Sequence, residues 1–263
     1  MDARLLHVSD LHTGTHEEPD VERALARLVE RTEPQLVVAS GDLAHRGRRE
    51  QLERAADLLR SLGPPVLAVP GNHDLPYLPT RFVRPWEEFE RVWETTEPTA
   101  TLPGLHVVGL NSARPYRQQG GALSAAQLSD ARDRLAAAEP GALRVAVLHH
   151  HLIGAPWRAA RKWPVSHRNS VLRGLAGAGA DLILAGHIHQ AAVSERHEFE
   201  VVGDEAHTAV IAVAPGLGQP RPQRLGEARG LHLHEADAES IVVRTFRWSR
   251  GDWVLGAERR FAR

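Results

Sequence analysis

The sequence predicts an α/β protein built around a parallel sheet, and three observations support this prediction. Short apolar runs alternate with segments whose apolar residues recur at helical spacing. Turn residues follow the apolar runs, as at Gly41-Asp42 and Gly71-Asn72. A strand–helix–strand rhythm of this kind implies parallel strands joined by right-handed crossovers.

The first part of the chain contains three predicted strands and two predicted helices. Each strand is a short apolar run, and each helix has an apolar stripe. Glycine and two prolines at positions 63–65 end the second helix. The strands are expected at Arg4–Val8, Leu36–Ala39 and Val66–Val69, and the helices at Val21–Arg31 and Arg49–Leu62.

The rest of the chain continues this pattern after a less regular insertion, Leu75–Pro103, with a short helix from about Pro85. Ser124 and Gln127 form a capping box that opens a helix to about Ala138. A further helix is expected near Ser170–Ala176, strands at Leu105–Leu110, Leu143–Leu148 and Leu182–Ala185, and short β segments at Thr208–Val213, Leu231–His234 and Ile241–Phe246. Without a repeat or linker, residues 1–263 are predicted to form one domain.

The composition of the chain narrows the range of possible functions. The 263 residues are 42% hydrophobic, enough for a substantial core, and the net charge of -1 provides no general attraction for a nucleic-acid backbone. There is no cysteine, which excludes disulfides and thiolate ligands and fits a reducing cytosol. The N-terminal apolar run is too short for a signal peptide, and no stretch approaches the roughly 20 apolar residues of a membrane span. We therefore expect a cytoplasmic protein without a membrane partner.

Five short motifs in a fixed order carry the candidate chemistry. Each follows a predicted strand, and ligands in open α/β sheets bind beyond the carboxyl ends of the strands. The motif side chains offer oxygen and imidazole ligands, which suit two divalent metal ions. The motifs are Asp10-x-His12, Gly41-Asp42, Gly71-Asn72-His73-Asp74, the histidine run from His149, and Gly186-His187-x-His189.

The segments "HVSDLH", "VVASGDLAHRG", "AVPGNHD", "VAVLHHH" and "LILAGHIH" resemble the calcineurin-like metallophosphoesterase superfamily. The chain is most similar to the bacterial branch with the class III cyclic-nucleotide phosphodiesterases, because it has the insertion with "PWEEF" and the capped helix before the histidine run. The resemblance implies a four-layer α/β/β/α sandwich of two mixed sheets flanked by helices. It also implies that the C-terminal β segments build the second sheet.

The resemblance further implies a ligand set and a mechanism. Two transition metals, with Mn, Fe, Zn and Co all open, would lie about 3.5–4 Å apart and activate a bridging hydroxide. His73 would face the substrate and stabilise charge or protonate the leaving group, and Asp74 would orient His73 or a metal ligand. The implied ligands are Asp10, His12 and His189 for one ion, Asn72, His149 and His187 for the other, and Asp42 as the bridge.

Several positions leave alternatives open. We take His149 as the ligand of the histidine run, with His150 as a supporting group or a substrate contact. Arg46 either contacts phosphate or is a solvated cation, and the basic stretch from Arg158 to Arg173 either binds a charged leaving group or is a solvated face. Trp157 and Trp163 are expected to pack rather than to stack a base, and His45 is expected on the surface.

Together these features predict a metal-dependent phosphoric ester hydrolase that acts on phosphodiesters, cyclic nucleotides among the candidates. Its partner would be a small phosphate ester, with no extended nucleic-acid surface and an undetermined oligomeric state. A phosphomonoesterase or nucleotide pyrophosphatase of the same superfamily remains an alternative. A non-catalytic metal-binding scaffold is the alternative of another class, although such scaffolds usually lose ligands and this chain retains the whole set.

Overall fold

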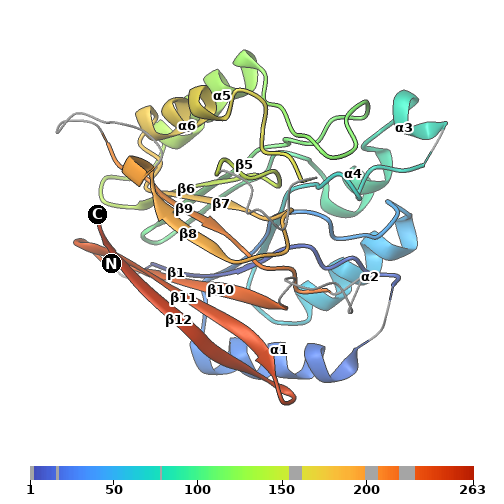
Figure 1. Cartoon of the computed structure of the whole chain (residues 1–263), viewed down its shortest axis with the longest axis horizontal. Coiled ribbons are helices and arrows are strands. Elements are labelled where there is room, and N and C mark those ends of the chain that lie inside the picture. The colour runs from blue at the N-terminus through green and yellow to red at the C-terminus, as the bar shows by residue number, and fades with distance from the viewer. Residues whose placement is uncertain (1–2, 16–17, 78, 154–161, 199–206, 219–228) are drawn as a thin grey trace.

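Two six-stranded mixed sheets pack face to face (Figure 1). The computed structural model describes residues 3–15, 18–77, 79–153, 162–198, 207–218 and 229–263. The first sheet has the order β12 (Asp252–Ala262), β11 (Ser240–Ser249), β10 (Gly230–Ala236), β1 (Ala3–Val8), β2 (Leu36–Ala39), β3 (Val66–Ala68). The second has the order β4 (Thr99–Leu102), β5 (Leu105–Gly109), β6 (Leu143–Val147), β7 (Leu182–Ala185), β9 (Val210–Val213), β8 (Ala192–Glu195).

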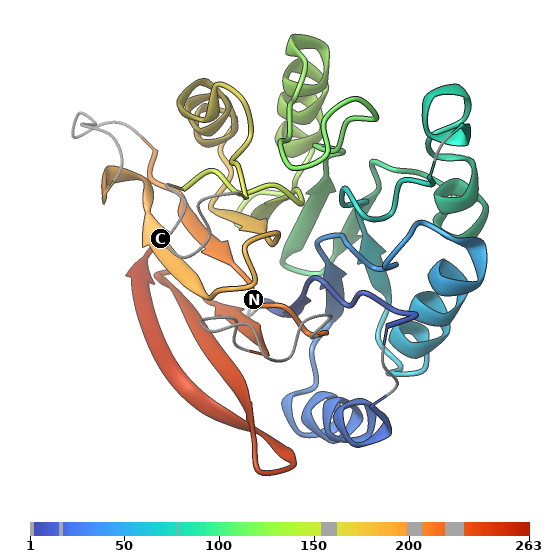
Figure 2. The same ribbon diagram turned by 45° about the vertical axis from the view of Figure 1, so that its right-hand side comes forward.

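Helices cover the outer face of each sheet, which gives the predicted four-layer sandwich (Figure 2). On the first sheet lie α1 (Pro19–Thr32), α2 (Arg49–Arg60) and α4 (Glu87–Trp93). On the second lie α5 (Ala125–Ala136) and α6 (Arg168–Gly177). The short helix α3 (Thr80–Val83) and a 3-10 turn, Arg196–Glu198, complete the described helices. Among the described residues, no helix has the length and apolar character needed to cross a membrane.

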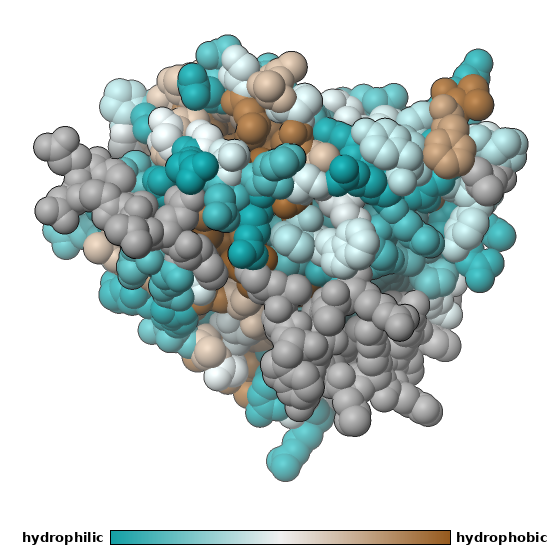
Figure 3. All heavy atoms as spheres, turned by 45° about the horizontal axis from the view of Figure 1, so that its top comes forward, coloured by the Kyte–Doolittle hydropathy of each residue, from teal (hydrophilic) through white to brown (hydrophobic). Residues whose placement is uncertain are grey.

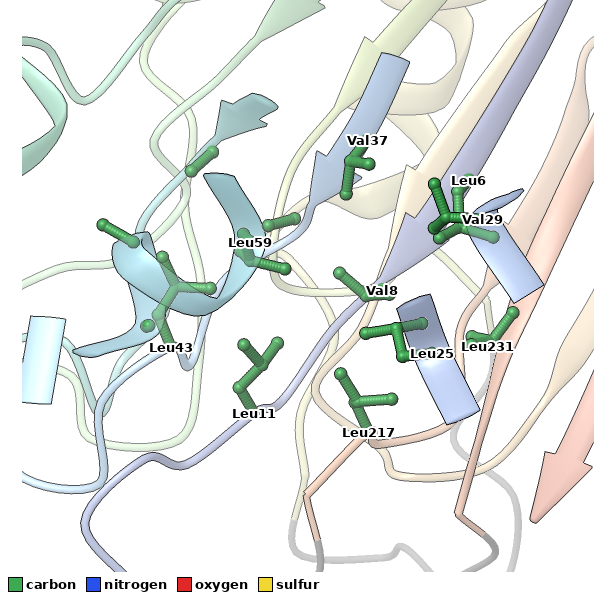
Figure 4. Close-up of a cluster of buried hydrophobic side chains, with 14 of the residues drawn as sticks. Leu6, Val8, Leu11, Leu25, Val29, Val37, Leu43, Leu59, Leu217 and Leu231 are labelled. Atoms are coloured by element: carbon green, nitrogen blue, oxygen red, sulfur yellow. The ribbon is translucent and has the colours of Figure 1, made fainter. Parts of the chain in front are cut away.

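Three apolar layers hold the sandwich together, and strand β1 shows how the sequence builds them. Side chains alternate across a strand, so Leu6 and Val8 pack against α1 and α2 while Leu5 faces the other sheet. Figure 4 shows Leu6 and Val8 in the outer layer beside Leu25 of α1. Because both faces of β1 are buried, the strand is apolar along most of its length, as expected for a parallel sheet.

The predicted element order is confirmed, with Leu36–Ala39 and Leu182–Ala185 at the predicted bounds. The placement of the C-terminal segments is wrong in part. β9 and β8 join the second sheet, but β10, β11 and β12 extend the first, because β10 pairs antiparallel with the edge of β1 that β2 leaves open. Strands β4, β8 and β12 had not been predicted. The division into one domain stays a prediction.

Candidate metal centre

The predicted ligands converge from both sheets. Asp10 and His12 follow β1, Asp42 follows β2 and Asn72 follows β3, all in the first sheet. The remaining ligands follow strands β6 and β7 of the second sheet: His149, His187 and His189. All seven side chains are buried. The meeting place is therefore the carboxyl ends of strands from two packed sheets.

One group of ligand atoms joins Asp10, His12 and His189, whose candidate atoms lie within 4.8 Å of one another. Asp10 Oδ1 lies 2.9 Å from His189 Nε2, and this nitrogen lies 3.2 Å from His12 Nε2. Nitrogens bound to one tetrahedral zinc-type ion at 2.0–2.1 Å would be roughly 3.3 Å apart. The spacing therefore fits a shared ion.

A second group joins Asp42, His149 and His187, again within 4.8 Å. Asp42 Oδ2 lies 3.4 Å from His149 Nε2 and 3.8 Å from His12 Nε2, so one carboxylate oxygen faces both groups. The other oxygen, Oδ1, accepts a hydrogen bond from the His73 amide at 2.8 Å. The hydrogen bond from the His73 amide thus fixes the Asp42 carboxylate and leaves Oδ2 directed between the two groups.

Backbone and hydroxyl groups orient the ligands. Ser9 Oγ and the His187 amide both donate to Asp10 Oδ2, which leaves Oδ1 for the first group. His149 Nδ1 donates to the Ser40 carbonyl at 2.8 Å and His187 Nε2 donates to the Gln119 carbonyl at 3.1 Å. Each imidazole thus presents its other nitrogen to the centre, as metal-binding histidines do.

Electrostatics couple the buried groups. Burial disfavours ionisation of Asp42, but the charge of His149 and then of His73 outweighs it and holds the pKa of Asp42 well below its usual value. Burial would lower the pKa of His149, but Asp42 and Asp10 together raise it to about 9. For His12 and His187 burial dominates and lowers the pKa well below the usual value, so their imidazoles are neutral and carry a lone pair for a metal.

The backbone at the ligands is strained. Five of the predicted ligands have positive φ angles in the left-handed region, between 49° and 74°. Such conformations cost of order 1–3 kcal/mol each in non-glycine residues, and they cluster at functional sites. The five are Asp10, His12, Asp42, His187 and His189.

His73 and Asp74 occupy different environments. His73 is half-buried; its Nδ1 donates to the His45 carbonyl at 2.9 Å, and its ring lies edge-on to His12 with centroids 4.8 Å apart. Asp74 is buried and accepts from the amides of Ala44 and Gly71, so the His45 carbonyl rather than Asp74 orients the His73 ring. Burial and the neighbouring Asp42 carboxylate raise the pKa of Asp74 to about 7.

The three consecutive histidines have different neighbours. His149 lies in the second group, whereas His150 is fully buried with Nδ1 2.9 Å from Ser112 Oγ. His151 Nδ1 donates to the Ile153 carbonyl. His150 therefore stands beside His149 and His187, with ring centroids 5.0 and 4.7 Å away, in the position of a supporting group.

Three further side chains with predicted roles differ in their exposure to solvent. Arg46 is exposed and its guanidinium lies 5.9 Å from the Tyr77 ring centroid. His45 was expected on the surface, but it is half-buried and its ring stacks on His73. Trp163 was expected to pack but is 62% exposed, and its amide donates to the same Gln119 carbonyl that holds His187.

Figure 3 shows hydrophobic side chains scattered among hydrophilic ones over one face of the molecule. Trp157, Arg158 and Arg161 lie outside the described residues, so the predicted roles of this tryptophan and of the basic stretch stay open.

The buried atoms fit two metal ions. Asn72 Oδ1 and His187 Nδ1 are buried and lack a hydrogen-bond partner within the described part of the chain. Leaving such atoms unpaired costs about 1–3 kcal/mol each, which a bound cation would remove. Carboxylate, amide and imidazole donors in this proportion suit divalent transition metals.

Comparison with known proteins identifies the family. Residues 3–191 match the calcineurin-like phosphoesterase family. The chain belongs to this family. A probable cyclic nucleotide phosphodiesterase from Synechococcus sp. is 31% identical over 62% of this chain and 61% of its own length. The 3',5'-cyclic adenosine monophosphate phosphodiesterase CpdA of Haemophilus influenzae is 27% identical over 77% of this chain and 76% of its own. The chain thus spans less than two thirds of the first relative.

Solved structures agree on the fold. The chain superimposes on purple acid phosphatase PPD1 from yellow lupin seeds with a TM-score of 0.75 and 12% identity, covering 100% of this chain and 54% of that one. For PhoD the TM-score is 0.67 at 11% identity, covering 97% of this chain and 68% of that one. At such low identity these likenesses support the arrangement of the two sheets and nothing finer.

Gly71 controls the position of Asp42, and we expect Gly71→Ala to disrupt the centre. A Cβ at this residue would lie 2.2 Å from Asp42 Oδ1 and 2.3 Å from the Asp42 amide nitrogen. Relieving the overlap should cost about 1–3 kcal/mol of stability and reduce metal binding. Gly177→Ala at the end of α6, where nothing lies within 4 Å, is the matched control. Thermal unfolding and metal analysis would detect both effects, and unchanged metal content in Gly71→Ala would contradict this role.

Adjacent histidines allow a second test. His149→Ala should remove one metal ion per chain relative to wild type, because Nε2 faces Asp42. His150→Ala should keep the wild-type metal content, because the His150 ring hydrogen-bonds to Ser112. Elemental analysis by plasma mass spectrometry measures both variants under identical conditions. The reverse result would move the ligand by one residue.

Proposed function

We propose that this chain is a metal-dependent phosphodiesterase, with cyclic nucleotides as the first candidate substrates. The observation that carries the proposal is Asp42 Oδ2, which faces His149 on one side and His12 on the other. A single carboxylate oxygen between two groups of candidate ligands is the arrangement expected of a bridged pair of ions. The predicted cytoplasmic location and the identity of the metal stay predictions.

The proposed ligands are Asp10, His12 and His189 for one ion and His149 and His187 for the other, with Asp42 shared. Asn72, whose Oδ1 is buried without a hydrogen-bond partner in the described part of the chain, is proposed as a further ligand of the second ion. Two divalent ions bound there would supply a nucleophile at neutral pH and neutralise the charge on phosphoryl oxygens. The chain supplies the rest. Ser9 holds Asp10, and the Ser40 carbonyl holds His149, so little reorganisation is needed when substrate binds.

His73 is proposed to assist the leaving group. Its Nδ1 proton is committed to the His45 carbonyl, which only accepts. In the protonated ring Nε2–H is therefore the group available to donate to a leaving alkoxide. His73 is half-buried, unlike the buried ligands around it, which is consistent with contact to a substrate.

The substrate class rests on the relatives and on the surroundings of the centre. The Synechococcus and Haemophilus relatives are named as cyclic nucleotide phosphodiesterases. Trp163 is exposed and linked through Gln119 to His187, a position suited to stacking a base. Arg46 beside Tyr77 offers a positive charge to a phosphate. We propose the side chains of Trp163, Arg46 and Tyr77 as substrate contacts.

We expect hydrolysis to require metal. Exhaustive chelation should abolish turnover of bis-p-nitrophenyl phosphate and of 3',5'-cyclic AMP, and Mn²⁺ should restore it better than Mg²⁺ because imidazole ligands favour transition metals. p-Nitrophenyl phosphate, a monoester, is the comparison substrate. Full activity after chelation would refute the metal mechanism, a preference for the monoester would favour a phosphomonoesterase, and binding of two ions without turnover would indicate a scaffold.

His73→Ala should retain the wild-type metal content but lower turnover by about 10²–10⁴. The loss should be large for an alkyl diester, whose leaving group needs a proton, and much smaller for a nitrophenyl diester. His106→Ala, which alters another largely buried histidine whose nitrogens pair with Thr101 and the Arg134 carbonyl, controls for the loss of an imidazole. An equal loss on both substrates would instead indicate that His73 positions the phosphate.

A further inference from the structure

A second cluster of histidines lies outside the centre described above. His7 on β1 and His232 and His234 on β10 are at most 1% exposed, and their candidate ligand atoms lie within 4.8 Å of one another. The antiparallel register places His7 opposite His232, and His234 lies two residues further along the same face of β10. The three rings form a nearly equilateral triangle with centroids 5.7, 5.7 and 6.0 Å apart.

The cluster sits in the apolar layer between the two sheets. Leu5 and Ala3 share the inward face of β1 with His7, and Ala236 shares the inward face of β10 with His232 and His234. Apolar side chains would be more stable at these positions, because moving a polar group from water into an apolar layer is unfavourable. Three histidines at these positions therefore call for a ligand or a network of hydrogen bonds.

Hydrogen bonds account for only one of the six ring nitrogens. His7 Nε2 lies 2.8 Å from Ser40 Oγ. The other five nitrogens, namely His7 Nδ1 and both nitrogens of His232 and His234, are buried and find no hydrogen-bond partner among the residues that the structure describes. The rings do not hydrogen-bond one another. A cation at the centre of the triangle would satisfy one nitrogen of each ring.

The protonation state suits a metal. Burial lowers the pKa of all three histidines, in the case of His232 to about 3. At neutral pH each imidazole is therefore uncharged and carries a lone pair. Neutral imidazole binds zinc, copper, nickel and iron, and Ser40 holds the His7 ring as supporting groups hold metal-binding histidines.

We propose that His7, His232 and His234 form a third metal site, separate from the centre around Asp42, that takes Zn²⁺ or a similar late transition-metal ion. At metal–nitrogen distances of 2.0–2.1 Å the ring centroids of a tetrahedral site would be roughly 5 Å apart, so the side chains close around the ion by roughly 0.5–1 Å. The ion links β1, which leads into Asp10, to β10 from the C-terminal part of the chain.

His234→Leu tests the proposal, with His106→Leu as the control. His106 is also buried, but its nitrogens are paired with Thr101 and the Arg134 carbonyl. Protein is produced in zinc-supplemented medium and its metal content is measured after the same dialysis. We expect one ion per chain fewer in His234→Leu than in wild type, with a lower Tm, and no change of metal content in His106→Leu. Equal metal content in His234→Leu and wild type overturns the proposal, whatever the Tm.

A second measurement does not depend on the variant folding. Crystals of wild-type protein from the same medium are measured at the zinc absorption edge. An anomalous peak between the three rings supports the site, and its absence overturns it, even when peaks are present at the centre around Asp42. Neither readout uses hydrolysis, so failure of the proposed phosphodiesterase activity and failure of this site are distinguishable.

Discussion

The hydrogen bond from the His73 amide to Asp42 Oδ1 is the contact on which the centre depends. It joins the loops that follow β2 and β3 and directs Oδ2 between the two ligand groups. Residue 71 lies so close to Asp42 that only glycine fits there. Asp74 ties the same two loops together through the amides of Ala44 and Gly71. One motif thus contains a proposed ligand and a candidate acid and also fixes the carboxylate that we propose to be shared.

The two sheets contribute unlike chemistry to this arrangement. The first brings both carboxylates and the amide, and the second brings most of the imidazoles. The Ser40 carbonyl crosses between them by accepting from His149. Because opposite charges from the two sheets stabilise one another in a buried region, the alignment of the sheet ends and the ionisation of Asp42 and His149 depend on each other.

Much of this architecture is predictable from the sequence, because a strand followed by a turn and a ligand leaves a local pattern. Asp10, Asp42 and His187 all follow apolar runs directly. Backbone carbonyls, such as those of Ser40 and Gln119, orient the histidine rings, and backbone amides help to orient the two carboxylates. A backbone group has no residue identity to detect in a sequence. The exposure of Trp163 and the place of β10 depend on tertiary contacts between distant segments.

Like the place of β10, strand β12 could not be found from the sequence. Its residues are mostly exposed and show little alternation, so that its pairing with β11 defines it. Ser112 offers a similar case, since no motif marks it, yet its hydroxyl fixes the His150 ring. Both features belong to the three-dimensional structure and leave too weak a periodic signal for sequence reasoning.

The pairing of β1 with β10 also bears on how the chain folds. β1 finds β2 nearby, but its other edge pairs with a strand that begins only at Gly230. Until that segment has been synthesised, the open edge of a largely apolar strand is available to pair with other molecules. Closure of such a distant contact is slow. A chain interrupted before β10 would therefore retain every proposed metal ligand of the centre around Asp42 and yet be prone to aggregate during synthesis.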